Sequence, residues 1–168
     1  MTERMAKRGR PRKWQSVFTA VMLPGAHRSY YEAQAKRHGL VLGSYLVWQL
    51  ALRHGLEVPS QLEAELRAAR NVHAQTGIDL AATSGEVTAT VERPSWQPKH
   101  YTGVRLPVAH RRFYEAERTR FGLPHLSSYL VWQLALQHGL EIPIELEAEL
   151  CASRNARAQG GFDLASAS

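Results

Sequence analysis

Histidine, cysteine and carboxylate side chains are the residues of this 168-residue chain that could bind a metal or catalyse a reaction. The eight histidines and the single cysteine, Cys151, show no spacing such as H-E-x-x-H that would direct several ligands to one metal. Glu63 and Glu65, like Glu147 and Glu149, are two residues apart on an expected helix and so face different sides, which argues against a paired acid and base. No phosphate-binding loop or nucleophile motif accompanies them. We therefore expect no enzyme, no metal and no cofactor.

A basic segment near the N-terminus has chemistry suited to nucleic acid. Residues 7–13 read KRGRPRK, and the glycine and proline would hold this segment extended and thin. Arginines on both sides could enter an A·T-rich minor groove, where the negative potential is deepest. The segment resembles an AT-hook, and the alternative is a basic tail that binds any nucleic acid. The residues of this arm are Lys7, Arg8, Gly9, Arg10, Pro11, Arg12 and Lys13.

The formal net charge of +6 is concentrated in the arm. Residues 1–13 contain six Lys or Arg and one Glu, a net of +5, so the remainder of the chain has a net charge of only +1. Hydrophobic residues make up 44%, enough for a packed core, yet no apolar stretch reaches the roughly 20 residues of a membrane helix. No secretory signal is recognisable. We expect a cytoplasmic, nucleoid-associated protein without a membrane partner.

An internal duplication positions the remaining residues. Residues 44–59 and 128–143 match at 14 of 16 positions, and residues 18–40 resemble 101–123 more loosely, with one extra residue near Pro124-His125. Two copies with so long a period indicate paired small units rather than a solenoid. The predicted divisions are a basic arm (1–13), a first repeat (14–58) with a tail helix (59–82), a linker (83–97), and a second repeat (98–142) with a tail helix (143–168).

Each repeat is expected to contain a strand, two helices and the tail helix. In repeat 1 we predict a strand over 17–23, a helix over 24–38, a second helix that Ser44 caps, and a tail helix after Pro59. The second helix is apolar nearly all round, with a core role predicted for its tryptophan, and about 40 residues cannot bury such a helix alone. Pairing of the two strands and of the two central helices within one chain would solve this problem.

The sequence Gly103-Val104-Arg105-Leu106-Pro107, followed by a helix and an S-x-Y-L-led second helix, resembles the ribbon-helix-helix superfamily of Arc/MetJ/CopG-type DNA-binding proteins. The resemblance covers about residues 17–56 and 100–140, and repeat 1 departs from it with Met22 where repeat 2 has Arg105. It implies a mainly α fold with a short two-stranded antiparallel β-ribbon. Two β-α-α repeats would form an intramolecular pseudo-dimer, each with an extra C-terminal helix.

The resemblance also implies which residues bind DNA. The ribbon would lie in the major groove, where Arg105 could pair bidentately with guanine, and the first amides of each second helix would bind phosphates. Ordinary helix capping is the alternative for those amides, and the apolar strand face of repeat 1 could instead be buried against protein. The base-contacting positions are Phe18, Ala20, Met22, Tyr101, Gly103 and Arg105, and the phosphate-contacting positions are Gly43, Ser44, Ser127 and Ser128.

Sequence-specific binding to double-stranded DNA is thus the expected function, most simply in a transcriptional repressor with an asymmetric site. A plasmid relaxosome or partition accessory would use the same binding, and tandem copies resemble relaxosome accessory proteins. An antitoxin, whose tail helices occlude a protein partner, is a third hypothesis. Association of several chains on DNA is compatible with each of them.

Overall fold

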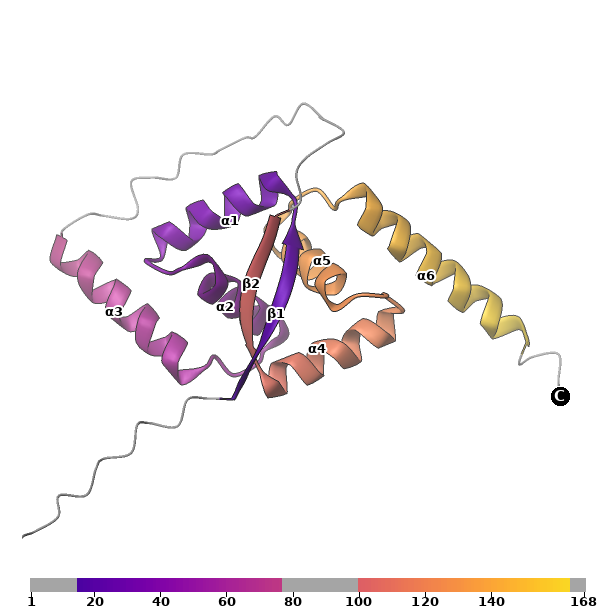
Figure 1. Ribbon diagram of the computed structural model, residues 1–168, viewed down its shortest axis with the longest axis horizontal. Coiled ribbons are helices and arrows are strands. Elements are labelled where there is room, and N and C mark those ends of the chain that lie inside the picture. Colours follow the sequence, from indigo (N-terminus) through magenta and orange to yellow (C-terminus); the bar gives the residue numbers. More distant parts are fainter. Residues whose placement is uncertain (1–14, 77–99, 164–168) are drawn as a thin grey trace, which may run out of the picture.

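The computed structural model describes residues 15–76 and 100–163, and within them the chain forms six helices and a two-stranded antiparallel sheet (Figure 1). The arm (7–13) and the linker (83–97) lie outside the described residues. The elements follow the predicted order in both repeats. They are β1 (Ser16–Leu23), α1 (Gly25–Arg37), α2 (Leu42–His54), α3 (Ser60–Thr76), β2 (His100–Pro107), α4 (Val108–Phe121), α5 (Leu126–His138) and α6 (Ile144–Asp163).

Proline and glycine set the helix boundaries largely as predicted. Helices α1 and α4 begin directly after a proline, and α2 and α5 end at Gly55 and Gly139, which adopt the left-handed conformation with φ of 62° and 64°. The predicted Ser44 cap is wrong, because α2 already begins at Leu42 after Val41. Leu42 packs against the core, so apolar contact rather than a capping hydroxyl determines this helix start.

Strands β1 and β2 pair along their whole length, with Ala20 opposite Gly103 at the centre. Alternation places Val21 and Leu23 of β1 on the buried face, together with Val104 and Leu106 of β2. The ribbon therefore has one face in the core and one face exposed.

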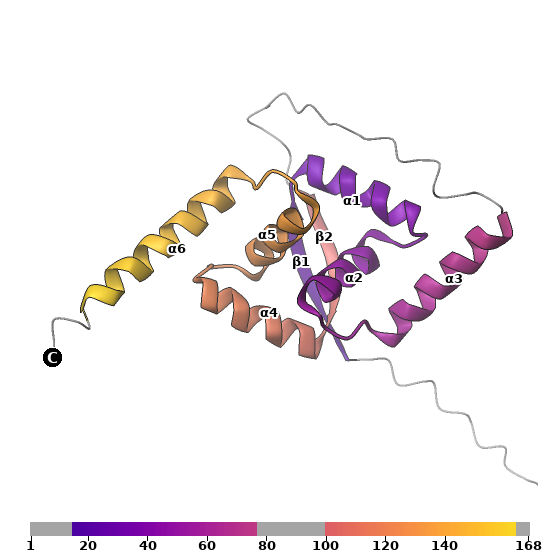
Figure 2. The same cartoon turned by 180° about the vertical axis from the view of Figure 1, so that it is seen from behind.

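The core lies between the two repeats. Helix α2 packs on β2 and α5 packs on β1, while α2 and α5 also pack on each other behind the ribbon (Figures 1 and 2). Each central helix thus covers the strand of the other repeat. The expected intramolecular pairing of strands and of central helices is confirmed, and it explains how so apolar a helix is buried.

Histidines join the repeats at these contacts. The ring of His138 lies 5.5 Å from that of Tyr31, and the ring of His54 lies 5.5 Å from that of Tyr114. His27 hydrogen-bonds through Nε2 to the backbone oxygen of Glu141 at 2.8 Å. The rings of His54 and His138, at the ends of α2 and α5, therefore pack between the repeats.

The tail helices bury one stripe each. Leu62 and Leu66 of α3 and Leu146 and Leu150 of α6 join the core, as the leucine spacing predicts. Trp132 is buried and packs edge-on against Phe121 at 4.9 Å, which confirms its predicted core role. Among the described residues, no helix is long and apolar enough to cross a membrane.

Candidate nucleic-acid interface

The exposed face of the ribbon carries all six residues that the sequence predicts to contact bases. Direct pairing brings them together as Phe18 with Arg105, Ala20 with Gly103, and Met22 with Tyr101. Phe18 and Tyr101 are 66% and 73% exposed, so two aromatic rings face solvent on one small surface. A guanidinium and a phenol provide the hydrogen-bonding side chains of this face, one toward each end.

The two ends of the ribbon face are chemically different. Arg105 and Phe18 lie at one end, while Tyr101 and Met22 lie at the other. In the alignment of the two repeats, Phe18 corresponds to Tyr101 and Met22 corresponds to Arg105. The backbone is therefore nearly twofold symmetric, but the side chains are not.

Gly103 makes room for the ring of Phe18. A Cβ atom at Gly103 would lie 2.5 Å from Cε2 of Phe18, so the ring extends diagonally over the glycine of the opposite strand. The ring of Phe18 therefore occupies the place at the centre of the ribbon face where a side chain at position 103 of β2 would lie. Period-two alternation predicts that Phe18 is exposed, but it does not predict this cross-strand position.

The predicted phosphate-binding residues lie in the first turns of α2 and α5. Gly43 and Ser44 are the second and third residues of α2, and Ser127 and Ser128 hold the same places in α5. Neither helix has a side-chain hydrogen bond from its capping residue, Val41 or His125. The first backbone amides of both helices are therefore not capped in this way, which suits an anion.

A carboxylate lies beside one of these helix starts. The hydroxyl of Ser44 donates to Oε2 of Glu65 in α3 at 2.9 Å, so this hydroxyl is engaged within the protein. The negative charge also opposes a phosphate at the same helix start. Sequence reasoning did not place Glu65 beside this helix start, because residues 21 positions apart on different helices have no common sequence signal. Glu149, its counterpart in α6, has Oε2 buried without a hydrogen-bond partner.

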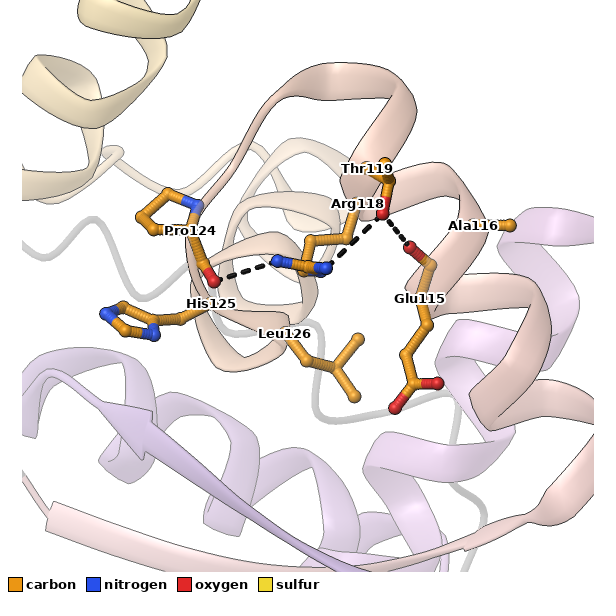
Figure 3. Close-up of a pocket in the computed structure, with 7 residues that line it drawn as sticks. All are labelled: Glu115, Ala116, Arg118, Thr119, Pro124, His125 and Leu126. Atoms are coloured by element: carbon orange, nitrogen blue, oxygen red, sulfur yellow. Dashed lines mark hydrogen bonds between the residues drawn. The ribbon is translucent and has the colours of Figure 1, made fainter.

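The loop before α5 is fixed by an arginine that has no counterpart in repeat 1. Arg118 donates through Nη1 to the backbone oxygens of Leu123 and Pro124, at 3.0 and 2.8 Å. These bonds hold the loop with the extra residue, whereas repeat 1 has Ala35 at the matching position. Arg118, Pro124, His125 and Leu126 are among the residues that line an open hollow of about 500 Å³. Figure 3 shows Arg118 pointing toward Pro124, with His125 next to Pro124.

Ion pairs form along the surfaces of α1 and α4. Arg28 lies 2.7 Å from Glu32, and Arg111 lies 2.8 Å from Glu115, each four residues apart and partly exposed. Such pairs are typical of a solvated helix face. Within the described ranges, no group of histidine, cysteine or acidic side chains could hold a metal ion, and Cys151 is exposed on α6.

No protein-family model, curated protein or solved structure matches this chain.

Proposed function

We propose that this protein is a ribbon-helix-helix DNA-binding protein, most simply a transcriptional repressor, which inserts its β1–β2 ribbon into the major groove. The observation that carries the proposal is the exposed ribbon face with Arg105 and Tyr101 among apolar side chains. Exposed aromatic residues gathered on a rigid surface are characteristic of binding sites, since their exposure to water is unfavourable. A two-stranded ribbon fits the width of the major groove.

The uncapped starts of α2 and α5 support the proposal, because amides at both helix starts suit the DNA backbone on either side of a groove. The arm over 7–13 directly precedes β1 in the sequence and would add minor-groove binding beside the ribbon. General attraction to DNA would come mainly from this arm, because the rest of the chain is nearly neutral. Sequence preference would come from the ribbon.

The different ends of the ribbon imply an asymmetric DNA site. Arg105 would read a guanine at one end, where its guanidinium can donate hydrogen bonds to both O6 and N7. Phe18 and Met22 would contact thymine methyl groups, which are the apolar features of the groove floor. A strict palindrome is not the expected target.

Binding-site selection from random double-stranded DNA tests this proposal. The full chain should select a non-palindromic motif with a fixed guanine, and Arg105→Ala should lose roughly 1–3 kcal/mol of preference for that guanine. Arg112→Ala removes an equal charge from an exposed position on α4 and serves as the control, with a somewhat weaker overall affinity but an unchanged motif.

Two results would contradict the proposal. One is that the folded chain selects no motif above background. The other is that Arg105→Ala and Arg112→Ala have equal effects on the selected motif, since Arg105 would then contribute only charge. A parallel selection without residues 1–13 separates the arm: loss of A·T-rich flanks indicates minor-groove readout, and identical motifs indicate a basic tail.

A further inference from the structure

Helix α6 exposes most of its surface. Leu146 and Leu150 are buried, and Ser153 on the same stripe donates a hydrogen bond to the backbone oxygen of Gly122 at 2.7 Å. Beyond Ser153, all side chains over 154–158 are exposed. In both views α6 forms the outer edge of the molecule, and its C-terminal end lies away from the other helices (Figures 1 and 2).

The outward side of α6 has the spacing of a helix–helix seam. Ile144, Ala148, Cys151 and Asn155 follow one another at intervals of four, three and four residues, and all are exposed. This is the alternation of the two core positions in a coiled coil. Ile144 is 75% exposed, which is unfavourable for so large an aliphatic side chain without a partner. Alanine and cysteine further along would allow a second helix to approach closely.

Charges beside the seam define the direction of that second helix. Glu147 directly precedes Ala148 and Arg154 directly precedes Asn155, so both charges flank the seam on the same side. If a second α6 packs antiparallel, with Ala148 opposite Cys151 of the second copy, Glu147 faces Arg154 of that copy. The same pair forms again by symmetry. A parallel arrangement would place Glu147 beside Ala152 of the second copy and form no such ion pair.

The repeat provides an internal comparison. Helix α3 has the same charge order, with Glu63 and Arg70 at the matching positions, but its seam contains Arg67 where α6 has Cys151. A second difference is Ser60 in place of Ile144. An arginine inside the seam would be desolvated without a partner, so α3 lacks the apolar surface that α6 offers. Only one of two otherwise similar tail helices therefore has a self-complementary face.

We propose that α6 is a self-association helix, on which α6 of a second copy of this chain docks antiparallel through Ile144, Ala148, Cys151 and Asn155. The contact is the same on both copies, so it closes as a twofold pair and does not continue into a filament. It goes beyond DNA binding and does not depend on it. If the ribbon binds DNA, the pair would hold two ribbons together and favour neighbouring sites through a raised local concentration.

Sedimentation velocity of the full chain tests the association under reducing conditions, over a concentration range of about 5–500 µM chosen for a weak contact. The wild-type chain should shift from one copy to two. Cys151→Arg places in the α6 seam the arginine that α3 has at the matching position, and it should raise the dissociation constant at least about tenfold. Ala68→Arg adds the same charge at an exposed position of α3 and is the matched control, which should leave the association unchanged. Circular dichroism and thermal unfolding check that the exposed substitutions preserve the fold.

A charge exchange tests the direction of packing. Glu147→Arg and Arg154→Glu should each weaken association, since each places two like charges opposite one another, and the double variant should restore it. A short bismaleimide should also link two chains through Cys151, the single cysteine. The proposal is overturned if the wild-type chain stays single at the highest concentration. It is equally overturned if Cys151→Arg has no effect, if Ala68→Arg alters association, or if association is not restored in the double variant.

Discussion

Phe18 lies over Gly103 of the opposite strand, and this pair makes the centre of the ribbon face aromatic. The ring is 66% exposed, so it contributes little to the core and much to the surface that would meet DNA. Its position depends on the missing side chain of Gly103, because a Cβ would lie 2.5 Å from the ring. In the proposed function, Gly103 would therefore act on recognition through its neighbour Phe18.

Gly103→Ala should therefore change recognition more than stability. The added methyl group displaces the exposed Phe18 ring, so urea unfolding should show a loss of no more than about 1 kcal/mol. Binding-site selection should show altered preference at the central base pairs. Phe18→Ala combined with Gly103→Ala provides the control, because without the ring the methyl group has nothing to displace. If Gly103→Ala leaves the selected motif unchanged, the Phe18 position has no part in recognition.

Sequence patterns predict the residues of the ribbon face because strand alternation depends only on neighbouring positions. They do not predict what those residues touch across the fold. Ser44 shows the limit: its type and place suggest a helix cap, yet the helix begins at Leu42 and the hydroxyl bonds to Glu65. Contacts between separate helices depend on packing distances that no local pattern records.

At the scale of elements, the start of α2 combines backbone amides with a nearby carboxylate, that of Glu65. The backbone amides attract a phosphate, while the carboxylate of Glu65, which accepts a hydrogen bond from Ser44, repels it. The net attraction of the α2 start is therefore lower than that of a bare helix start. In the proposed function, the tail helix α3 would therefore lower the affinity of this helix start for DNA.

Glu65→Gln should tighten DNA binding about two- to fivefold at low salt, as expected for one charge near a helix terminus. The amide oxygen can still accept the Ser44 hydrogen bond, so the local structure is preserved. Glu63→Gln changes an exposed side chain of the same helix and is the control, with a smaller effect expected. Fluorescence anisotropy at several salt concentrations measures both, and the difference should shrink as salt screens the charge. Equal affinities for the Glu65→Gln variant and the wild-type chain would show that no phosphate binds near Ser44.

The starts of α1 and α4 follow from proline and the ends of α2 and α5 from glycine, and these boundaries are predictable because each residue acts on its own backbone. The loop before α5 is different. Its extra residue is evident from the shift between repeats, but the role of Arg118 in holding that loop is not, since Ala35 occupies the matching position in repeat 1. The duplication identifies the difference, and the folded structure explains it.

At the scale of the whole molecule, the two repeats are interlocked rather than side by side. Each central helix covers the strand of the other repeat, so neither repeat has a complete core of its own. The duplication and the all-round apolar central helix predict that the two strands pair and that the two central helices pack together, because one unit of about 40 residues cannot bury such a helix alone. Only the structure shows which strand each central helix covers. The direction in which the tail helices extend depends on few contacts and is not predictable from their leucine spacing.

Four buried or half-buried histidines at the junction of the repeats make this arrangement sensitive to acid. Burial lowers the pKa of His27, His54, His110 and His138 below the ordinary value of 6.5. The neighbouring Arg53 further lowers the pKa of His54, while Glu117 acts against this. Each ring has one buried nitrogen without a hydrogen-bond partner, which suits a neutral imidazole and not a charged one.

The free energy of unfolding should therefore fall as the pH drops through about 6.5, because the unfolded chain then binds protons that the folded chain does not. The loss continues down to the lowered pKa values of the folded state and then ceases. Each histidine adds up to about 1.4 kcal/mol per pH unit within that window. Urea unfolding between pH 5 and 8 measures the slope of the unfolding free energy against pH. His138→Gln should reduce this slope by the contribution of one proton, even though the variant is less stable overall. A free energy that is constant across this range would show that these rings do not lose their protons on folding. A slope that persists unchanged in His138→Gln would assign the effect to groups outside the junction of the repeats.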